Sequence, residues 1–295
     1  MGQQCTTVPV VESNVPADRV ERSLSEICPS DALPSPSAIL ILCLDPGQYD
    51  DPLKGWLKAV DLEMATAVNY WALSYVWGNP APYGVIDLGY MVPVTRNLDE
   101  ALRRFRYKHK ETVVWVDAVC IDQSNTEERG HQVGIMGKIY RRAENVVAWL
   151  GPDPLKKAKR CFDVLSKKHG KQELTPSEAF AMSELMTCEW FSRLWVVQEL
   201  VLAQNSRFVW GNVGMTTPVL WLSARGYNLA TTNADAVWVG KIFSGHTYDL
   251  IDLLTWTRRL KCSDDRDRIY AVLGLPYSTS SWFSSEIVQT IERRP

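Results

Sequence analysis

The sequence predicts an α/β protein with a doubly wound, mainly parallel sheet flanked by helices. From residue 70 to residue 210, apolar runs of strand length alternate with segments that have helical periodicity. Strands that alternate with helices are typical of parallel sheets, because each helix carries the chain back along one face. The stretch 113–123 begins with a near-continuous apolar run, which favours a strand buried on both faces.

The strands are bounded by turn residues. The run 38–44 stops at Asp45-Pro46-Gly47, and the run 70–77 stops at Gly78-Asn79-Pro80. Two short runs about Gly89 predict a hairpin. The region 48–68 is ambiguous. The predicted strands are 38–44, 70–77, 85–88, 91–94, 113–123, 145–150 and 207–210.

The helices are predicted from caps and apolar spacing. Asn97 with Glu100, and Ser124 with Glu127, have the spacing of capping boxes, which place a helix start at each pair. Apolar residues at intervals of three and four predict the others. These further helices are 156–169, 178–187, 189–203, 249–260 and 266–275.

The composition narrows the class of protein. The chain has 295 residues, of which 46% are hydrophobic, and its net charge of −2 gives no reason to expect nucleic-acid binding. The seven cysteines contain no C-x-x-C and the four histidines no H-x-x-x-H, so neither a disulfide framework nor a zinc site is expected. The longest apolar run, 38–44, is too short to span a bilayer. We therefore expect a cytoplasmic protein without a bound metal.

Both ends of the chain differ from the middle. Residues 1–36 are rich in proline and polar residues and read as a flexible lead-in, and 276–295 reads as a tail that starts a further region. The first six residues fit the acceptor pattern for N-myristoylation at Gly2, and Cys5 could carry a palmitate. Two acyl chains would attach the protein to a membrane, and the alternative is a chance match.

One acid stands out on an otherwise apolar helix. Glu199 follows Trp195 by four residues, so the two share a helix face. A carboxyl beside an aromatic wall can have a raised pKa or stabilise an oxocarbenium-like state during glycosidic cleavage. The alternative is a salt bridge from Glu199 to Arg193. A nucleophilic pair of Cys120 with His131 is less favoured, because an apolar strand buries a thiol as an inert group.

A second group of polar residues lies at the end of the predicted strand 113–123. Asp117, Asp122 and Gln123 follow or interrupt its apolar residues. The carboxyl ends of strands are where open α/β sheets bind ligands. These residues are therefore candidate ligand-binding groups, and the alternative is that they only satisfy nearby backbone and arginine groups.

Seven segments follow one another in a recognisable order. They are 73–78 (LSYVWG), 97–102 (NLDEAL), 115–123 (WVDAVCIDQ), 128–143, 149–151 (WLG), 190–199 (WFSRLWVVQE) and 267–274 (DRIYAVLG). In this order they resemble the fungal heterokaryon-incompatibility (HET) domain family. The likeness covers about residues 38–275, and it defines 37–275 as the expected domain.

The resemblance implies a cytosolic fungal protein that triggers regulated cell death when non-self is detected at hyphal fusion. HET domains are thought to be distant relatives of TIR domains, which implies a TIR-like (flavodoxin-like) sheet with family-specific insertions. The segment 195–200 is similar to the W-C-x-x-E-L helix of TIR enzymes that cleave NAD, in which the glutamate is catalytic.

This analogy makes NAD a substrate, with no bound cofactor, and Glu199 the catalytic residue that supports loss of nicotinamide. The implied partners are further copies of the chain on activation and a NOD-like or other incompatibility protein. The alternative is a non-enzymatic signalling module that triggers death by self-association or by recruiting a partner. The implied pocket residues are Tyr75, Trp77, Gly78, Asp117, Asp122, Gln123 and Trp195.

Overall fold

The structure is a computed structural model, and it describes residues 33–64, 68–166, 175–217, 238, 241 and 249–275. Most of the predicted lead-in, with Gly2 and Cys5, and the tail 276–295 lie outside the described residues. Within the described part of the chain, no helix combines the length and the apolar character needed to cross a membrane.

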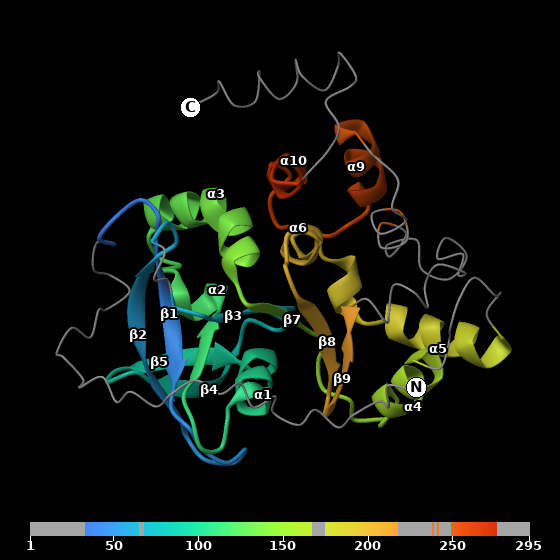
Figure 1. The fold of residues 1–295 in the computed structure, drawn as a ribbon, viewed down its shortest axis with the longest axis horizontal. Helices are drawn as coiled ribbons and strands as arrows, with labels where there is room; N and C mark the ends of the chain where they lie inside the picture. The colour runs from blue at the N-terminus through green and yellow to red at the C-terminus, as the bar shows by residue number, and fades with distance from the viewer. Residues whose placement is uncertain are drawn as a thin grey trace.

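A single nine-stranded mixed sheet organises the fold (Figure 1). Neighbouring strands pair in the order β5-β4-β2-β1-β6-β3-β7-β8-β9. In that spatial order the strands are β5 (Met91–Thr95), β4 (Pro82–Asp87), β2 (Leu53–Asp61), β1 (Ala38–Leu44), β6 (Thr112–Trp115), β3 (Trp71–Tyr75), β7 (Asn145–Trp149), β8 (Ser206–Trp210) and β9 (Val213–Thr216).

The predicted α/β class is confirmed, but the sheet is mixed rather than mainly parallel. The strands β6, β3, β7 and β8 are parallel to one another, and β2 pairs in parallel with β4. The pairs β1–β2, β1–β6, β4–β5 and β8–β9 are antiparallel. Short connections such as the turn at Gly89 can join only antiparallel neighbours, so each hairpin adds an antiparallel strand.

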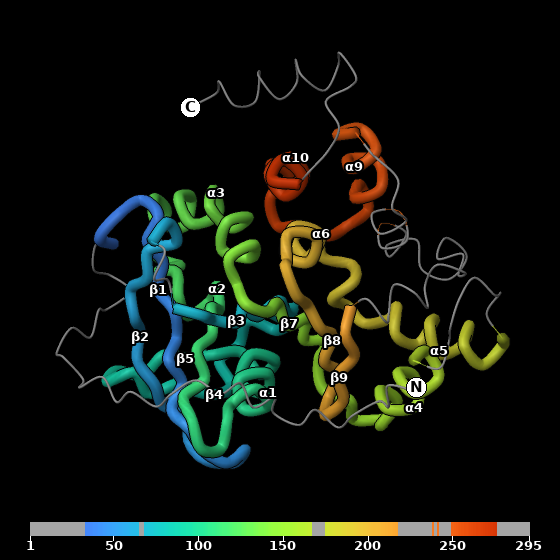
Figure 2. Tube along the Cα trace, viewed as in Figure 1, coloured from blue at the N-terminus to red at the C-terminus, as the bar shows by residue number. Residues whose placement is uncertain are grey.

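Helices lie on both sides of the strands β3 and β7. Figure 1 shows α3 and α6 on one side and α1 on the other, and the tube in Figure 2 shows α10 continuing the α6 side. The helices are α1 (Arg96–Phe105), α2 (Asp117–Cys120), α3 (Thr126–Arg142), α4 (Ala158–Ser166), α5 (Pro176–Met186), the 3-10 helix η1 (Glu189–Ser192), α6 (Val196–Val201), α9 (Leu250–Thr257) and α10 (Asp267–Leu273).

The two predicted capping boxes lie one or two residues away from the real caps. Thr95 caps α1 by accepting from the Leu98 N–H, and Asn125 caps α3 by accepting from two backbone N–H groups. Asn97 is therefore already inside the helix. Its side chain does not cap the helix and instead forms hydrogen bonds to residues at the ends of β3 and β7.

The predicted strand 113–123 is wrong beyond its first residues. β6 ends at Trp115, and Asp117 begins the short helix α2, with its carboxylate accepting from the Ala118 N–H at 2.7 Å. An acid that bonds the first free N–H groups of a helix stabilises a helix start at that position. Asp122 and Gln123 consequently follow a helix rather than a strand.

The predicted helix 189–203 is also wrong as one piece. It is divided into η1 and α6 by Arg193, whose backbone is extended and pairs with Lys261. The Leu194 N–H donates to the Lys261 carbonyl, and the Lys261 N–H donates to the Ser192 carbonyl. These contacts come from a segment about seventy residues away, which helix periodicity alone cannot reveal.

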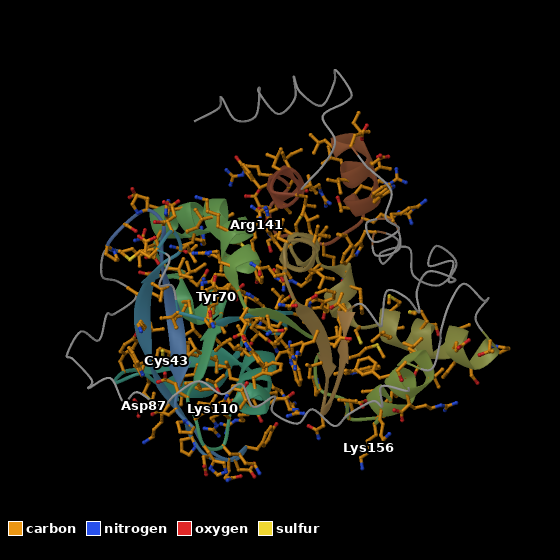
Figure 3. All side chains as sticks on the ribbon, in the orientation of Figure 1. Cys43, Tyr70, Asp87, Lys110, Arg141 and Lys156 are labelled. Atoms are coloured by element: carbon orange, nitrogen blue, oxygen red, sulfur yellow. The ribbon has the colours of Figure 1, made fainter. Side chains whose placement is uncertain are left out.

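Side chains fill the space between the sheet and its helices (Figure 3). Cys43 and Tyr70 lie inside, whereas Lys156 projects from the surface. One cluster of buried apolar residues surrounds β1, β3 and β6, and a second lies under α4, α5 and α6. Trp195 packs against both clusters, so it links the two halves of the core.

Asn97 joins the carboxyl ends of β3 and β7. Its Nδ2 donates to the Val76 carbonyl at 2.6 Å, and its Oδ1 accepts from Trp149 Nε1 at 2.8 Å. Replacing Asn97 by alanine leaves both partners without their hydrogen bond. We expect Asn97→Ala to lower the free energy of unfolding by about 2–3 kcal/mol in urea titrations. The exposed Asn79→Ala should change it by less than about 0.5 kcal/mol, and equal effects would contradict this role.

Candidate functional site

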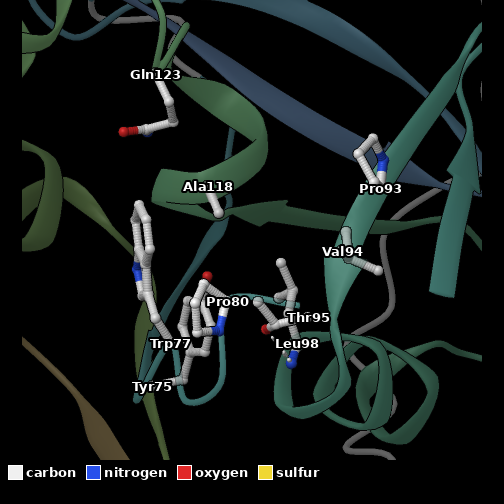
Figure 4. Close-up of a pocket in the computed structure, with 9 residues that line it drawn as sticks. All are labelled: Tyr75, Trp77, Pro80, Pro93, Val94, Thr95, Leu98, Ala118 and Gln123. Atoms are coloured by element: carbon white, nitrogen blue, oxygen red, sulfur yellow. Dashed lines mark hydrogen bonds between the residues drawn. The ribbon is translucent and has the colours of Figure 1, made fainter. Parts of the chain in front are cut away.

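A cavity opens beside the carboxyl end of β3. Its volume is about 210 Å³, and its walls come from the segment after β3, the β5–α1 corner and α2 (Figure 4). Figure 4 shows the Trp77 ring on one side, Gln123 above it, and Thr95 and Leu98 across the cavity. The lining residues are Tyr75, Trp77, Pro80, Pro93, Val94, Thr95, Leu98, Ala118 and Gln123.

Asp117 does not line this cavity, but it accepts hydrogen bonds from two of the aromatic residues that do. Trp77 Nε1 donates to the Asp117 carboxylate at 2.8 Å, and the Tyr75 hydroxyl donates to the same group. Although its side chain is partly exposed, protein atoms surround the carboxyl densely, and this desolvation raises the Asp117 pKa. The charge of Arg193 and the hydrogen bonds oppose that rise.

Glu199 is buried on α6, with only 3% of its surface exposed. The Ser74 hydroxyl donates to its carboxyl, and the Tyr140 hydroxyl lies within hydrogen-bonding reach. Trp190 Nε1 donates to the Ser74 oxygen at 2.8 Å, which leaves the Ser74 proton directed at Glu199. Desolvation raises the Glu199 pKa to about 7, against the lowering effects of Arg193 and these hydrogen bonds.

Arg193 acts on both acids through its charge, without forming an ion pair to either among the described residues. Its guanidinium donates to the Tyr75 carbonyl, and its charge lowers the pKa of both Asp117 and Glu199. The salt bridge that offered a purely structural explanation for Glu199 is therefore not formed. The two carboxyls share the field of one guanidinium, so the titration of one depends on the charge of the other.

The structure brings five of the eight predicted site residues together. Tyr75, Trp77 and Gln123 line the cavity, and Asp117 binds the first two. Gly78 follows β3 with a φ of 69°, a left-handed conformation that glycine adopts without strain.

The other three predicted residues lie outside the cavity walls. Asp122 accepts from the N–H and hydroxyl of Ser124 and thereby forms a local turn before α3. Trp195 Nε1 donates to the Asp267 carboxylate at 3.0 Å, which ties α6 to α10. Glu199 accepts a hydrogen bond from Ser74 and is not a lining residue of the cavity.

Sequence reasoning missed the residues that hold Glu199. Ser74, Tyr140 and Trp190 come from three different elements and gather around Glu199 only in the folded chain. Ser74 carried a usable signal, because it is a hydroxyl inside the apolar strand 71–75 and is 1% exposed. A buried hydroxyl requires a polar partner.

The Cys120 thiol is buried in this fold. It is 1% exposed, accepts from the Val116 N–H, and its pKa is raised to about 12 by burial. His131 instead contacts the Pro36 carbonyl at 2.6 Å. The sequence-based preference for an inert thiol is confirmed.

The buried acid predicts a dependence of stability on pH. The Glu199 pKa is about 7 in the folded chain and 4.5 as an ordinary carboxyl, so the folded state binds its proton more tightly. This contribution is complete below pH 4.5 and is lost as the pH rises through 7. Relative to Glu199→Gln, the wild-type free energy of unfolding should therefore fall by an amount on the order of 3 kcal/mol across this window. Urea titrations of both proteins measure it, and a constant difference would contradict the buried titration.

The fold and the site together define an α/β protein with an aromatic cavity at the carboxyl ends of parallel strands and a buried acid beside it. Residues 70–199 match the family model described as "Heterokaryon incompatibility protein (HET)", and this range contains β3, the cavity and Glu199. The resemblance to this family is confirmed over these residues.

A curated relative is the "Heterokaryon incompatibility protein 6, OR allele" of Neurospora crassa. It is 28% identical in an alignment of 237 residues, which covers 62% of this chain and 34% of the relative. The chain thus spans about a third of the length of this relative. No solved structure matches the chain.

Proposed function

We propose that this chain is a fungal HET-domain effector of regulated cell death in heterokaryon incompatibility, and that it acts by cleaving NAD. The family match supports the first part. The observation that carries the second part is the buried Glu199, whose pKa near 7 suits a group that exchanges a proton at physiological pH. Self-assembly on activation and an incompatibility partner belong to the same proposal.

The order of the parallel strands supports a TIR-like reading of the sheet. The strands β6, β3, β7 and β8 are, in chain order, the second, first, third and fourth parallel strands. This is the beginning of the flavodoxin-like order 2-1-3-4-5. In that order ligands bind at the carboxyl ends of the first and third strands, where the strand order reverses. Here these strands are β3 and β7, and the cavity lies at the end of β3.

The proposed reaction breaks the bond between the nicotinamide ring nitrogen and ribose C1′. The bonding electrons leave with the ring as neutral nicotinamide, and the ribose becomes an oxocarbenium-like centre that water attacks, with loss of a proton. A carboxylate stabilises this centre electrostatically and can accept the proton. Glu199 would perform this step.

The size of the cavity and the position of Glu199 limit how a dinucleotide could bind. A volume of about 210 Å³ is below the roughly 300–1,000 Å³ of ordinary ligand sites, so it accommodates one ring rather than the whole of NAD. Since Glu199 is behind Ser74, the proposal requires that substrate binding opens a path between the cavity and this carboxyl. The break at Arg193 between η1 and α6 offers a place for such a movement.

The proposal is tested in fungal cells that express the chain under an inducible promoter. Wild-type protein should deplete NAD before the cells die, and Glu199→Gln should leave both NAD and viability unchanged at equal protein level. Matched control cells express the exposed Glu63→Gln variant and should die like wild type. Death of the Glu199→Gln cells at the wild-type rate would overturn the assignment.

A non-enzymatic signalling module is the second candidate, favoured by exposed apolar side chains on the β4–β5 hairpin. Tyr83, Val85 and Met91 are 62%, 52% and 66% exposed. Exposed apolar side chains gathered on one hairpin are typical of a contact surface. This alternative predicts that Glu199→Gln still kills, whereas replacing these three residues by serine protects the cells.

A further inference from the structure

The wall of the cavity is uncharged and mostly apolar, which suits a flat aromatic ligand. Its lining combines two aromatic rings, two prolines and aliphatic side chains, with Thr95 and Gln123 as polar groups. No lining residue carries a charge. Trp77 is 40% exposed and presents its ring along one side of the cavity, as Figure 4 shows.

The aromatic walls are connected to a carboxylate that does not line the cavity. Trp77 Nε1 and the Tyr75 hydroxyl both donate to Asp117. A ring whose N–H donates a hydrogen bond to a carboxylate gains electron density, and an electron-rich indole face attracts a cation more strongly than a neutral group. The geometry therefore makes the Trp77 face a favourable neighbour for positive charge.

The charged groups near the cavity also favour a positively charged ligand. The charged groups that act on the Tyr75 hydroxyl include the carboxyls of Asp117 and Glu199 and the guanidinium of Arg193. With both carboxyls ionised this group has a net charge of −1. A cation in the cavity would complete the charge balance of these groups.

We propose that the cavity is a cation-selective aromatic site, which accepts the positively charged pyridinium ring of oxidised NAD and discriminates against the uncharged reduced ring. Gln123 and Thr95 supply the hydrogen-bonding groups that a carboxamide substituent needs. The identity of the nucleotide rests on the proposed function, whereas the preference for a monocyclic aromatic cation rests on the cavity alone.

The experiment compares 1-methylnicotinamide, a cation, with neutral nicotinamide, using the full chain and ligand-detected NMR titration without turnover. Wild type should bind the cation about 10-fold more tightly. Trp77→Leu and Asp117→Asn should remove the preference. Trp77→Phe, which keeps a ring but loses the donor to Asp117, should retain only part of it.

The controls separate this inference from catalysis. Tyr83→Leu changes an exposed aromatic residue outside the cavity and should bind as wild type does. Glu199→Gln should retain the greater part of the preference even if it releases no nicotinamide. Equal binding of the two ligands, undetectable binding of the cation, or an unchanged preference in Trp77→Leu would each overturn the inference, even if NAD is cleaved. Preference for the cation without NAD cleavage would support the inference and contradict only the proposed reaction.

Discussion

The Glu199→Gln protein should release nicotinamide from NAD at least about 100-fold more slowly than wild type. Glutamine has nearly the same shape and can still accept the hydrogen bond from Ser74, but it can neither carry negative charge nor take up a proton. The variant therefore removes the chemistry while keeping the packing. The measurement is nicotinamide released per mole of protein, resolved by chromatography.

Two comparisons make this prediction specific to the buried acid. Glu63→Gln, in which the replaced side chain is 68% exposed, should retain the wild-type rate. Glu199→Gln should unfold as cooperatively as wild type, because the residue is exchanged for an isosteric neutral one. Wild-type turnover by a folded Glu199→Gln protein would exclude Glu199 as the catalytic group.

Trp190→Ala should have the largest effect on stability, lowering the free energy of unfolding by about 3–5 kcal/mol. Trp190 is 0% exposed and packs edge-to-face against Phe191 and Phe208, with ring centroids 5.1 and 5.3 Å apart. Its indole also donates to Ser74. Alanine would leave a cavity in the second core cluster and a buried hydroxyl without its donor.

Urea titration monitored by far-UV circular dichroism measures this loss. Tyr83→Ala removes an aromatic ring that is 62% exposed and should change the free energy of unfolding by less than about 1 kcal/mol. Trp190→Phe keeps much of the packing and should fall between the two. A loss below about 1 kcal/mol in Trp190→Ala would contradict the role of this ring in the core.

The parallel strands of the fold could be predicted from sequence because their signal is local. The apolar run of β3 and the run of β7 are each closed by a glycine turn, and both strands have the predicted positions within about two residues. β1 has the predicted bounds, Ala38–Leu44. β2 lies in the region 48–68, which stayed ambiguous, and β9 was missed. Both strands are only partly buried, and a half-exposed strand has a weaker apolar pattern.

The errors arose where distant contacts override local preference. The strand 113–123 has high β propensity, but the chain turns into α2 after Trp115 because Asp117 provides a helix start and a carboxylate for Trp77 and Tyr75. The helix 189–203 is interrupted because Lys261 pairs with the backbone at Arg193. Trp77 and Tyr75 are distant in sequence from Asp117, and Lys261 is distant from Arg193.

The candidate site was predicted in part. The residue pattern singled out Gln123 and Glu199, and motif resemblance added Tyr75 and Trp77. The fold places these residues at or beside one strand end. It could not show that Ser74 and the cavity wall separate Glu199 from the cavity. That separation depends on opposite faces of β3, since successive strand side chains point in opposite directions.

The central claim is that the chain itself cleaves NAD through Glu199. The most direct test incubates purified wild-type protein with NAD over a wide range of protein concentrations, and follows the substrate and both products by proton NMR. Nicotinamide and an ADP-ribose product should accumulate in equal amounts as NAD disappears, with a rate per protein that rises as the chains assemble. Unchanged NAD at every concentration, with the protein folded, would contradict the claim.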